Sequence, residues 1–214
     1  MVLLSERPQL EREDNNSTRY MLYRQSGSFA YRDAILCFLL LALGAVEYVR
    51  GQTNVEESQV KAAFLFHFAE LVDWPADTSD RDRSLNICVF DDDPQRHELQ
   101  STLEGKLIGV RVLHIRLVSD PQAIPGCKIL FLSHDEGRRQ PDILRDLRDQ
   151  PVLTVGESDS FLSDGGMIRF HLESDRIRFD INLTAAESSH LKISSRLLLL
   201  ATSVTGRPSR NWSR

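Results

Sequence analysis

Four short apolar runs, separated by segments of helical or loop composition, constrain the fold of this chain more than any other feature. The first run shows no polar alternation over its last four residues, as expected for a central strand that is covered on both faces. Strands that alternate with helical segments are typical of a mostly parallel sheet, so the sequence predicts a three-layer α/β sandwich. The four predicted strands are Leu85–Phe90, Val110–Val118, Lys128–Leu132 and Pro151–Val155.

Helical segments surround these strands and are marked by apolar spacing and by proline. Apolar residues recur at helical spacing from Gln59 onward, and Pro75 makes Trp74 the expected end of the first helix. Asp93 before Pro94 is typical of an N-cap with proline at the first helical position. We expect packing helices at both ends of the domain and two helices between strands, over Gln59–Trp74, Asp93–Leu103, Pro141–Arg148 and Ala185–Thr202.

The first helix carries apolar residues on more than one face. One face can pack against the sheet, which leaves a second apolar face available for another subunit. The helix is therefore interpreted either as fully buried in the core of its own domain or as a dimer contact. The residues concerned are Phe64, Leu65, Phe66, Phe68, Leu71 and Trp74.

The pattern of apolar and polar residues changes after Gly165 and Gly166. Met167–Leu172 and Arg176–Leu183 alternate apolar with polar residues across a Glu-Ser-Asp turn, which predicts an antiparallel hairpin at a sheet edge. Part of its apolar face must cover the core, and the rest is predicted to be an exposed docking surface for a partner. The predicted partner-binding residues are Met167, Ile168, Phe170, Ile177, Phe179 and Ile181.

Composition and charge limit the classes of protein to which this chain can belong. With 41% apolar and 27% charged residues, the chain is an ordinary globular protein, and its 214 residues suffice for one good core or two small ones. A net charge of -5 argues against a general nucleic-acid binder, which would normally gather a basic excess on one face.

The N-terminal segment has the pattern of a secretory signal. Arg24 and Arg32 form a positive region, and the apolar run Ile35–Val46 follows. An uncleaved membrane anchor is the alternative, but spanning helices need about 20 apolar residues and Glu47 interrupts this run. We expect an N-terminal extension with a signal peptide over residues 1–52, a single α/β domain over residues 53–205, and a polar tail over residues 206–214.

The polar residues of the sequence show no pattern that is typical of a catalytic site. Asp91, Asp92 and Asp93 follow the first strand, where open α/β sheets place ligands, and could hold magnesium or accept a phosphoryl group. The alternative is that they are solvated loop acids and an N-cap. The 6 histidines are scattered singly without ligand spacing, and no serine lies in a nucleophile turn. We therefore expect no metal, no cofactor and no enzymatic activity.

Several blocks occur in an order that resembles the YfiR-like family of periplasmic regulators. The resemblance begins in the first helix with Trp74-Pro75 and spans roughly Val60 to Val204. The blocks after that helix are Leu85–Val89, Gly105-Lys106 with Val110–Ile115, Cys127–Ser133, Pro151–Val155, Gly165–Ile168 with Phe179–Leu183, and Ile193–Leu198.

The number and positions of the cysteines agree with export of the protein from the cytosol. Cys37 lies in the predicted signal, which leaves Cys88 and Cys127 as an even pair in an oxidising compartment. The pair is interpreted either as two buried thiols or as a disulfide between neighbouring strands, worth roughly 3 to 4 kcal/mol for a loop of about 40 residues. The family resemblance implies the disulfide. Some members have a second cysteine pair, which this sequence lacks.

The resemblance also implies a function. YfiR-like proteins repress a membrane-bound diguanylate cyclase by binding its periplasmic sensor domain, and an outer-membrane lipoprotein sequesters them. We expect this chain to be a periplasmic homodimer that lowers cyclic di-GMP signalling in this way. Two alternatives remain open: a small-ligand binder whose crevice is lined by Asp91, Ser133 and Gly156, and a hydrolase that uses Asp91 and Asp93.

Overall fold

The computed structural model describes residues 56–75 and 84–206, all within one compact unit, Thr53–Arg214. The predicted signal peptide with Cys37, the predicted polar tail from residue 207 onward and most of the loop after Pro75 lie outside the described residues. Within the described ranges, no helix is long and apolar enough to cross a membrane.

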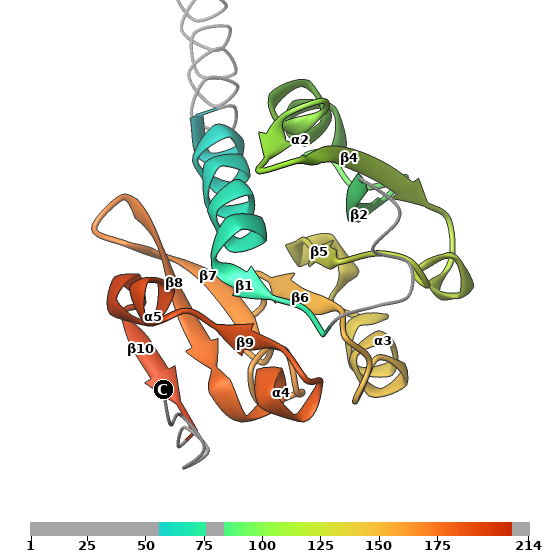
Figure 1. Ribbon diagram of the computed structural model, residues 1–214. Coiled ribbons are helices and arrows are strands. Elements are labelled where there is room, and N and C mark those ends of the chain that lie inside the picture. The colour runs from blue at the N-terminus through green and yellow to red at the C-terminus, as the bar shows by residue number, and fades with distance from the viewer. Residues whose placement is uncertain (1–55, 76–83, 207–214) are drawn as a thin grey trace, which may run out of the picture. The chain divides into compact units, whose positions relative to one another are not determined.

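The strands form an eight-stranded sheet in the order β10-β8-β7-β6-β5-β2-β4-β3 and a separate two-stranded pair, β1-β9 (Figure 1). The five central strands, β4, β2, β5, β6 and β7, pair with one another in parallel, which confirms the predicted α/β fold class. The strands of the large sheet are β2 Ser84–Phe90, β3 Leu107–Ile108, β4 Arg111–Val118, β5 Ile129–Leu132, β6 Leu153–Gly156, β7 Ile168–Glu173, β8 Arg176–Asn182 and β10 Ser203–Thr205.

Two hydrophobic cores lie on opposite faces of this sheet because alternate strand residues point to opposite sides. In β2, Ile87 belongs to the larger core and Cys88 to the smaller one. The leading helix (residues 56–71), α2 (Arg96–Leu103), α4 (Leu183–Ser188) and α5 (Ser195–Leu200) cover the larger core, and α3 (Gln140–Asp146) covers the smaller one. The domain therefore has the three predicted layers.

The antiparallel hairpin of β7 and β8 is confirmed, with Ile168 opposite Ile181 and Glu173 opposite Arg176. The sequence did not predict β10, which pairs in parallel with the last three residues of β8. The hairpin therefore shares this end of the sheet with a short terminal strand. Two 3-10 turns, Pro121–Ala123 and His134–Glu136, complete the connections.

The prediction of a single closing helix over Ala185–Thr202 is wrong. Asn182 caps α4 through its side chain, and His190, with a φ of 61°, turns the chain into β9 (Lys192–Ile193). Ser194 then caps α5 by accepting a hydrogen bond from the Leu197 amide. The break exists because β9 pairs with β1, a tertiary contact that local spacing does not encode.

The leading helix is also shorter at its end than expected. It stops at residue 71, three residues before Trp74, because Val72–Asp73 form β1 and pair with Ile193 and Lys192. Pairing with a distant strand therefore sets this boundary before Pro75 can act as a helix breaker.

Candidate functional site

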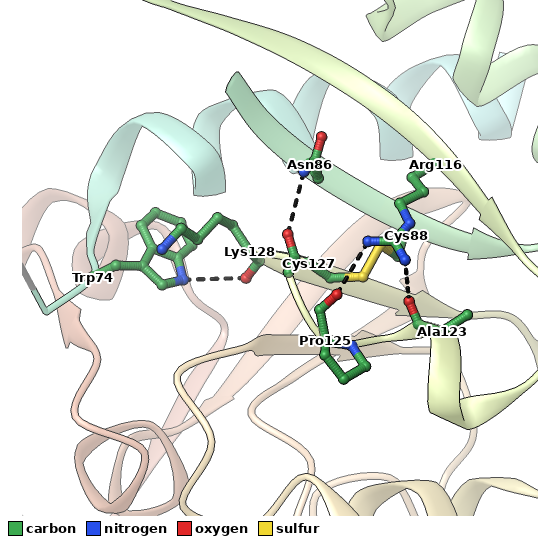
Figure 2. The surroundings of a disulfide bond; sticks show 9 residues. Trp74, Asn86, Cys88, Arg116, Ala123, Pro125, Cys127 and Lys128 are labelled. Atoms are coloured by element: carbon green, nitrogen blue, oxygen red, sulfur yellow. Dashed lines mark hydrogen bonds between the residues drawn. A yellow bond between two sulfur atoms is a disulfide. The ribbon is translucent and has the colours of Figure 1, made fainter. Parts of the chain in front are cut away.

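Cys88 and Cys127 form a disulfide that fastens β2 to the loop in front of β5 (Figure 2). Their Cα atoms lie 5.8 Å apart, and both residues are almost fully buried in the smaller core. The structure thus contains the disulfide that the family resemblance implied, and the alternative of two buried free thiols is wrong.

Two side chains, one from β4 and one from β2, also hold the loop that contains Cys127 (Figure 2). Arg116 of β4 donates to the carbonyl oxygens of Ala123 and Pro125, at 2.6 and 3.1 Å. Asn86 of β2 donates to the Gly126 carbonyl at 3.3 Å. These hydrogen bonds hold the loop in addition to the covalent link.

Trp74, which follows the leading helix, anchors this part of the chain close to the disulfide. Its indole Nε1 donates to the carbonyl oxygen of Lys128 at 3.1 Å, one residue after Cys127 (Figure 2). A partly buried indole with a satisfied N–H is typical of a structural anchor.

The leading helix buries a broad face. Leu65 and Phe68 are completely buried, whereas Phe64, Phe66, Leu71 and Trp74 are partly buried against the larger core. The rings of Phe64 and Phe68 contact the Phe170 and Phe179 rings of the hairpin in stacked, tilted and T-shaped geometries, with ring centroids 5.1 to 5.9 Å apart. The six predicted residues are therefore packing residues of this domain, and a dimer contact through them stays a prediction.

The prediction that part of the apolar face of the hairpin is an exposed docking surface is wrong. Ile177 is partly buried, and the other five residues are at most 3% exposed: Met167, Ile168, Phe170, Phe179 and Ile181. The alternation correctly identified one apolar face, but the leading helix covers it. The outer face of the hairpin is polar, with Arg169 donating to Asp180 at 2.7 Å.

The carboxyl ends of β2, β5 and β6 meet at a polar cluster organised around Glu157. Its carboxylate contacts Lys61 Nζ of the leading helix at 2.5 Å and accepts hydrogen bonds from the His134 amide and from Gln95 Nε2, both at 3.3 Å. The side chains of Lys61 and Glu157 are only 5% and 10% exposed. Lys61 also pairs with Glu57 at 2.5 Å, so one buried ammonium joins two carboxylates.

The three residues predicted to line this crevice have different environments. Asp91 is exposed, and Ser133 is buried at the end of β5. Gly156 does not line open space, because the Phe161 ring covers it so closely that a Cβ atom at this position would overlap the ring. Sequence reasoning missed Lys61 and Glu157, since nothing local pairs a helix lysine with a glutamate that follows a distant strand.

The aspartates after β2 have structural partners. Asp93 accepts a hydrogen bond from the Gln95 amide at 2.7 Å, in a capping geometry. Asp92 pairs with Arg139 at 2.9 Å, and Arg139 also holds the buried Glu136 at 2.8 Å. Burial raises the pKa of Glu136, although Arg139 opposes this effect. The described residues contain no group of three or more His, Cys, Asp or Glu side chains arranged to hold a metal ion.

Comparisons with known proteins agree with this architecture. A family model, DUF4154, described as YfiR/HmsC-like, matches residues 58–202. A conserved domain protein from Vibrio cholerae O1 biovar El Tor has a similar crystal structure, with a TM-score of 0.50, 12% sequence identity, and coverage of 67% of this chain and 60% of that chain. An ABC domain from Streptococcus pneumonia in complex with L-Trp has a TM-score of 0.43 and 10% identity, covering 56% and 55%.

The chain thus spans less than two thirds of the length of either solved structure. At 12% identity, the likeness to the Vibrio protein shows a shared α/β fold.

Proposed function

Because the chain belongs to the YfiR/HmsC-like family, we propose that it regulates diguanylate cyclase signalling by binding and repressing the periplasmic sensor domain of a membrane-bound diguanylate cyclase. The observation that carries this proposal is the family match, which spans residues 58–202 and so includes nearly the whole described domain. Lower cyclic di-GMP, and with it less biofilm growth, is the expected output.

The proposed compartment is the periplasm, where an N-terminal signal peptide would deliver the chain. The buried disulfide between Cys88 and Cys127 supports this assignment, because disulfides persist in oxidising compartments and are rare in the cytosol. We place the function in binding and not in catalysis, because the best-placed acids already serve the fold: Asp92 pairs with Arg139, and Glu157 pairs with Lys61.

Two further partners belong to the proposal. One is an outer-membrane lipoprotein that sequesters the regulator and so releases the cyclase. The other is a second copy of this chain in a homodimer. Because the apolar hairpin face is buried, docking has to use other surfaces, and among the described residues the most exposed large apolar side chains are Leu107, Val110, Leu172 and Leu199.

A binding experiment tests the proposal directly. The purified protein is titrated calorimetrically with the purified sensor domain of a periplasm-facing cyclase from the same genome. We expect saturable binding that is lost when both partners are unfolded, and no binding to the cytoplasmic catalytic domain as the matched control. Absence of binding to the sensor domain of every such cyclase would contradict the proposal.

A further inference from the structure

A small cavity lies beside the first half of β6, at the opposite end of this strand from Glu157. Its volume is about 140 Å³. Four segments contribute to its wall: the end of α3, β6 itself, the turn that leads into β7, and the end of α4. Figure 1 shows α3 and α4 at this end of the sheet. The cavity is therefore bounded by helices that cover different cores.

The interior of the cavity is largely apolar, and its mouth carries no net charge. Leu144 and Met167 line the interior and are 5% and 3% exposed. At the mouth, the exposed residues Arg148 and Asp149 have opposite charges that cancel. A neutral ligand fits these surroundings better than an ion, which would have to lose its hydration in an apolar space.

Two buried hydroxyl groups also line the cavity, and the first of them, Thr154, is a fixed hydrogen-bond donor. Thr154 is 2% exposed, and its Oγ1 accepts a hydrogen bond from the Met167 amide at 3.1 Å. This bond holds the hydroxyl in place and occupies part of its acceptor capacity. Its O–H is not donated to any described residue, so Thr154 can offer a donor to a molecule in the cavity.

The second hydroxyl belongs to Ser189, the residue that ends α4. The Ser189 amide donates to the Ala185 carbonyl at 3.2 Å, but the hydroxyl makes no hydrogen bond with any described residue. Ser189 is only 2% exposed, and it lines the cavity. A buried hydroxyl without a partner is costly and calls for an explanation. The cavity is the space in which a partner for Ser189 fits.

The volume sets the size of the molecule that can enter. An apolar protein cavity of about 150 Å³ holds one benzene molecule. The cavity beside β6 has nearly the same volume, about 140 Å³, so a single six-membered ring fills it. Two hydroxyls in an otherwise apolar wall match a ring that carries one polar group.

We propose that this cavity binds a small neutral ring compound that carries a single hydroxyl group, such as a phenol. The ring packs against Leu144 and Met167, Thr154 donates to the ligand oxygen, and Ser189 accepts from the ligand hydroxyl. No covalent step is involved. The site does not rest on the proposed regulatory function.

Titration of the purified, isotope-labelled protein with phenol, followed by NMR, tests the proposal. We expect saturable shifts of the Met167 and Ser189 amide signals. Benzene, which lacks the hydroxyl, and benzoate, which carries a charge, are the matched controls and should both bind more weakly than phenol.

Two variants test the assignment to this cavity. Ser189→Ala should weaken the affinity for phenol roughly three- to tenfold, because one neutral hydrogen bond is lost. Ser195→Ala, at an exposed position of α5, should leave it unchanged. Ala185→Leu places a larger side chain in the cavity and should abolish binding, whereas Ala63→Leu, on the exposed side of the leading helix, should not.

Each outcome decides the proposal. No saturable binding of phenol, or benzene or benzoate binding as tightly as phenol, would overturn it. Unchanged phenol affinity in Ala185→Leu would place the binding elsewhere and would overturn it as well. The melting temperature of each variant without ligand shows whether the variant is folded. No measurement involves a cyclase, so failure here is distinguishable from failure of the proposed regulatory function.

Discussion

At the scale of single residues, the molecule depends on a few buried charges that join distant parts of the chain. Lys61 lies on the leading helix and Glu157 follows β6, and their contact at 2.5 Å fastens the helix to the carboxyl end of the sheet. A buried ion pair adds little stability in comparison with apolar packing, but the loss of one partner leaves an uncompensated charge.

Replacement of Lys61 should therefore destabilise the protein strongly. We expect Lys61→Met to lower the free energy of unfolding by roughly 3 to 5 kcal/mol, because Glu57 and Glu157 would share a buried site without a cation. Urea unfolding measures the change, and Lys192→Met, at an exposed position of β9, is the matched control. The double variant Lys61→Met with Glu157→Gln should recover part of the loss; a loss equal to that of Lys192→Met would contradict this account.

Glu104 should give the molecule a small acid-side pH dependence. The Ile115 amide donates to Glu104 Oε2 at 2.7 Å, and this bond, together with His114, holds the pKa of Glu104 below its ordinary value. The carboxylate therefore stabilises the folded state at neutral pH, and this contribution is lost as the pH falls through the lowered pKa. Because the side chain is 41% exposed, the effect should be at most about 1 kcal/mol.

Chemical denaturation of the protein and of Glu104→Gln across the acid range measures this contribution. The stability difference between the two should be constant near neutral pH and should shrink below about pH 4.5, the ordinary carboxyl value. A difference that grows as the pH falls would mean that the sign is wrong.

At the scale of elements, specific contacts fasten the leading helix and the loop before β5 to the sheet. The leading helix packs through an aromatic cluster of Phe64, Phe68, Phe170 and Phe179, while the disulfide and Arg116 fasten the loop before β5. The smaller core around Cys88 and Cys127 has fewer large side chains than the other core. The disulfide therefore supports the less extensively packed side of the sheet.

Removal of the disulfide should destabilise the domain without unfolding it. For a sequence separation of 39 residues, Cys88→Ser with Cys127→Ser should cost roughly 3 to 4 kcal/mol in the chain-entropy model. Denaturant unfolding with and without reductant measures this cost. Reductant should lower the stability of the parent protein and leave the double variant unchanged. Equal stabilities of parent and variant without reductant would show that the bond does not constrain the unfolded chain.

Elements that are buried on both sides could be predicted from the sequence, and elements defined by distant contacts could not. β2, β5 and β6 are apolar runs because helices cover both faces of a central parallel strand. The leucines at the end of the chain have helical spacing, but the pairing of β9 with β1 divides that segment.

The candidate site was predictable to a similar degree. Topology indicated the carboxyl ends of the strands, and Ser133 does follow β5, but its role in a ligand crevice stays a prediction. The pairing of Lys61 with Glu157 depends on the packing of the leading helix, which no local pattern encodes. Alternation in the hairpin separated its two faces but did not show that Phe170 and Phe179 would meet Phe68.

At the scale of the whole molecule, the described residues form one α/β domain of the YfiR/HmsC-like family. Its disulfide suits an oxidising compartment, and its polar clusters hold the fold together.

The level of cyclic di-GMP in living cells tests the regulatory role most directly. The gene is deleted alone and together with each neighbouring cyclase gene, and cyclic di-GMP is quantified in every strain. We expect a rise in cyclic di-GMP in the single deletion, reversal by the restored gene, and no rise when the partner cyclase is also absent. An unchanged level in a strain that normally produces the protein, or a rise that persists without any neighbouring cyclase, would contradict it.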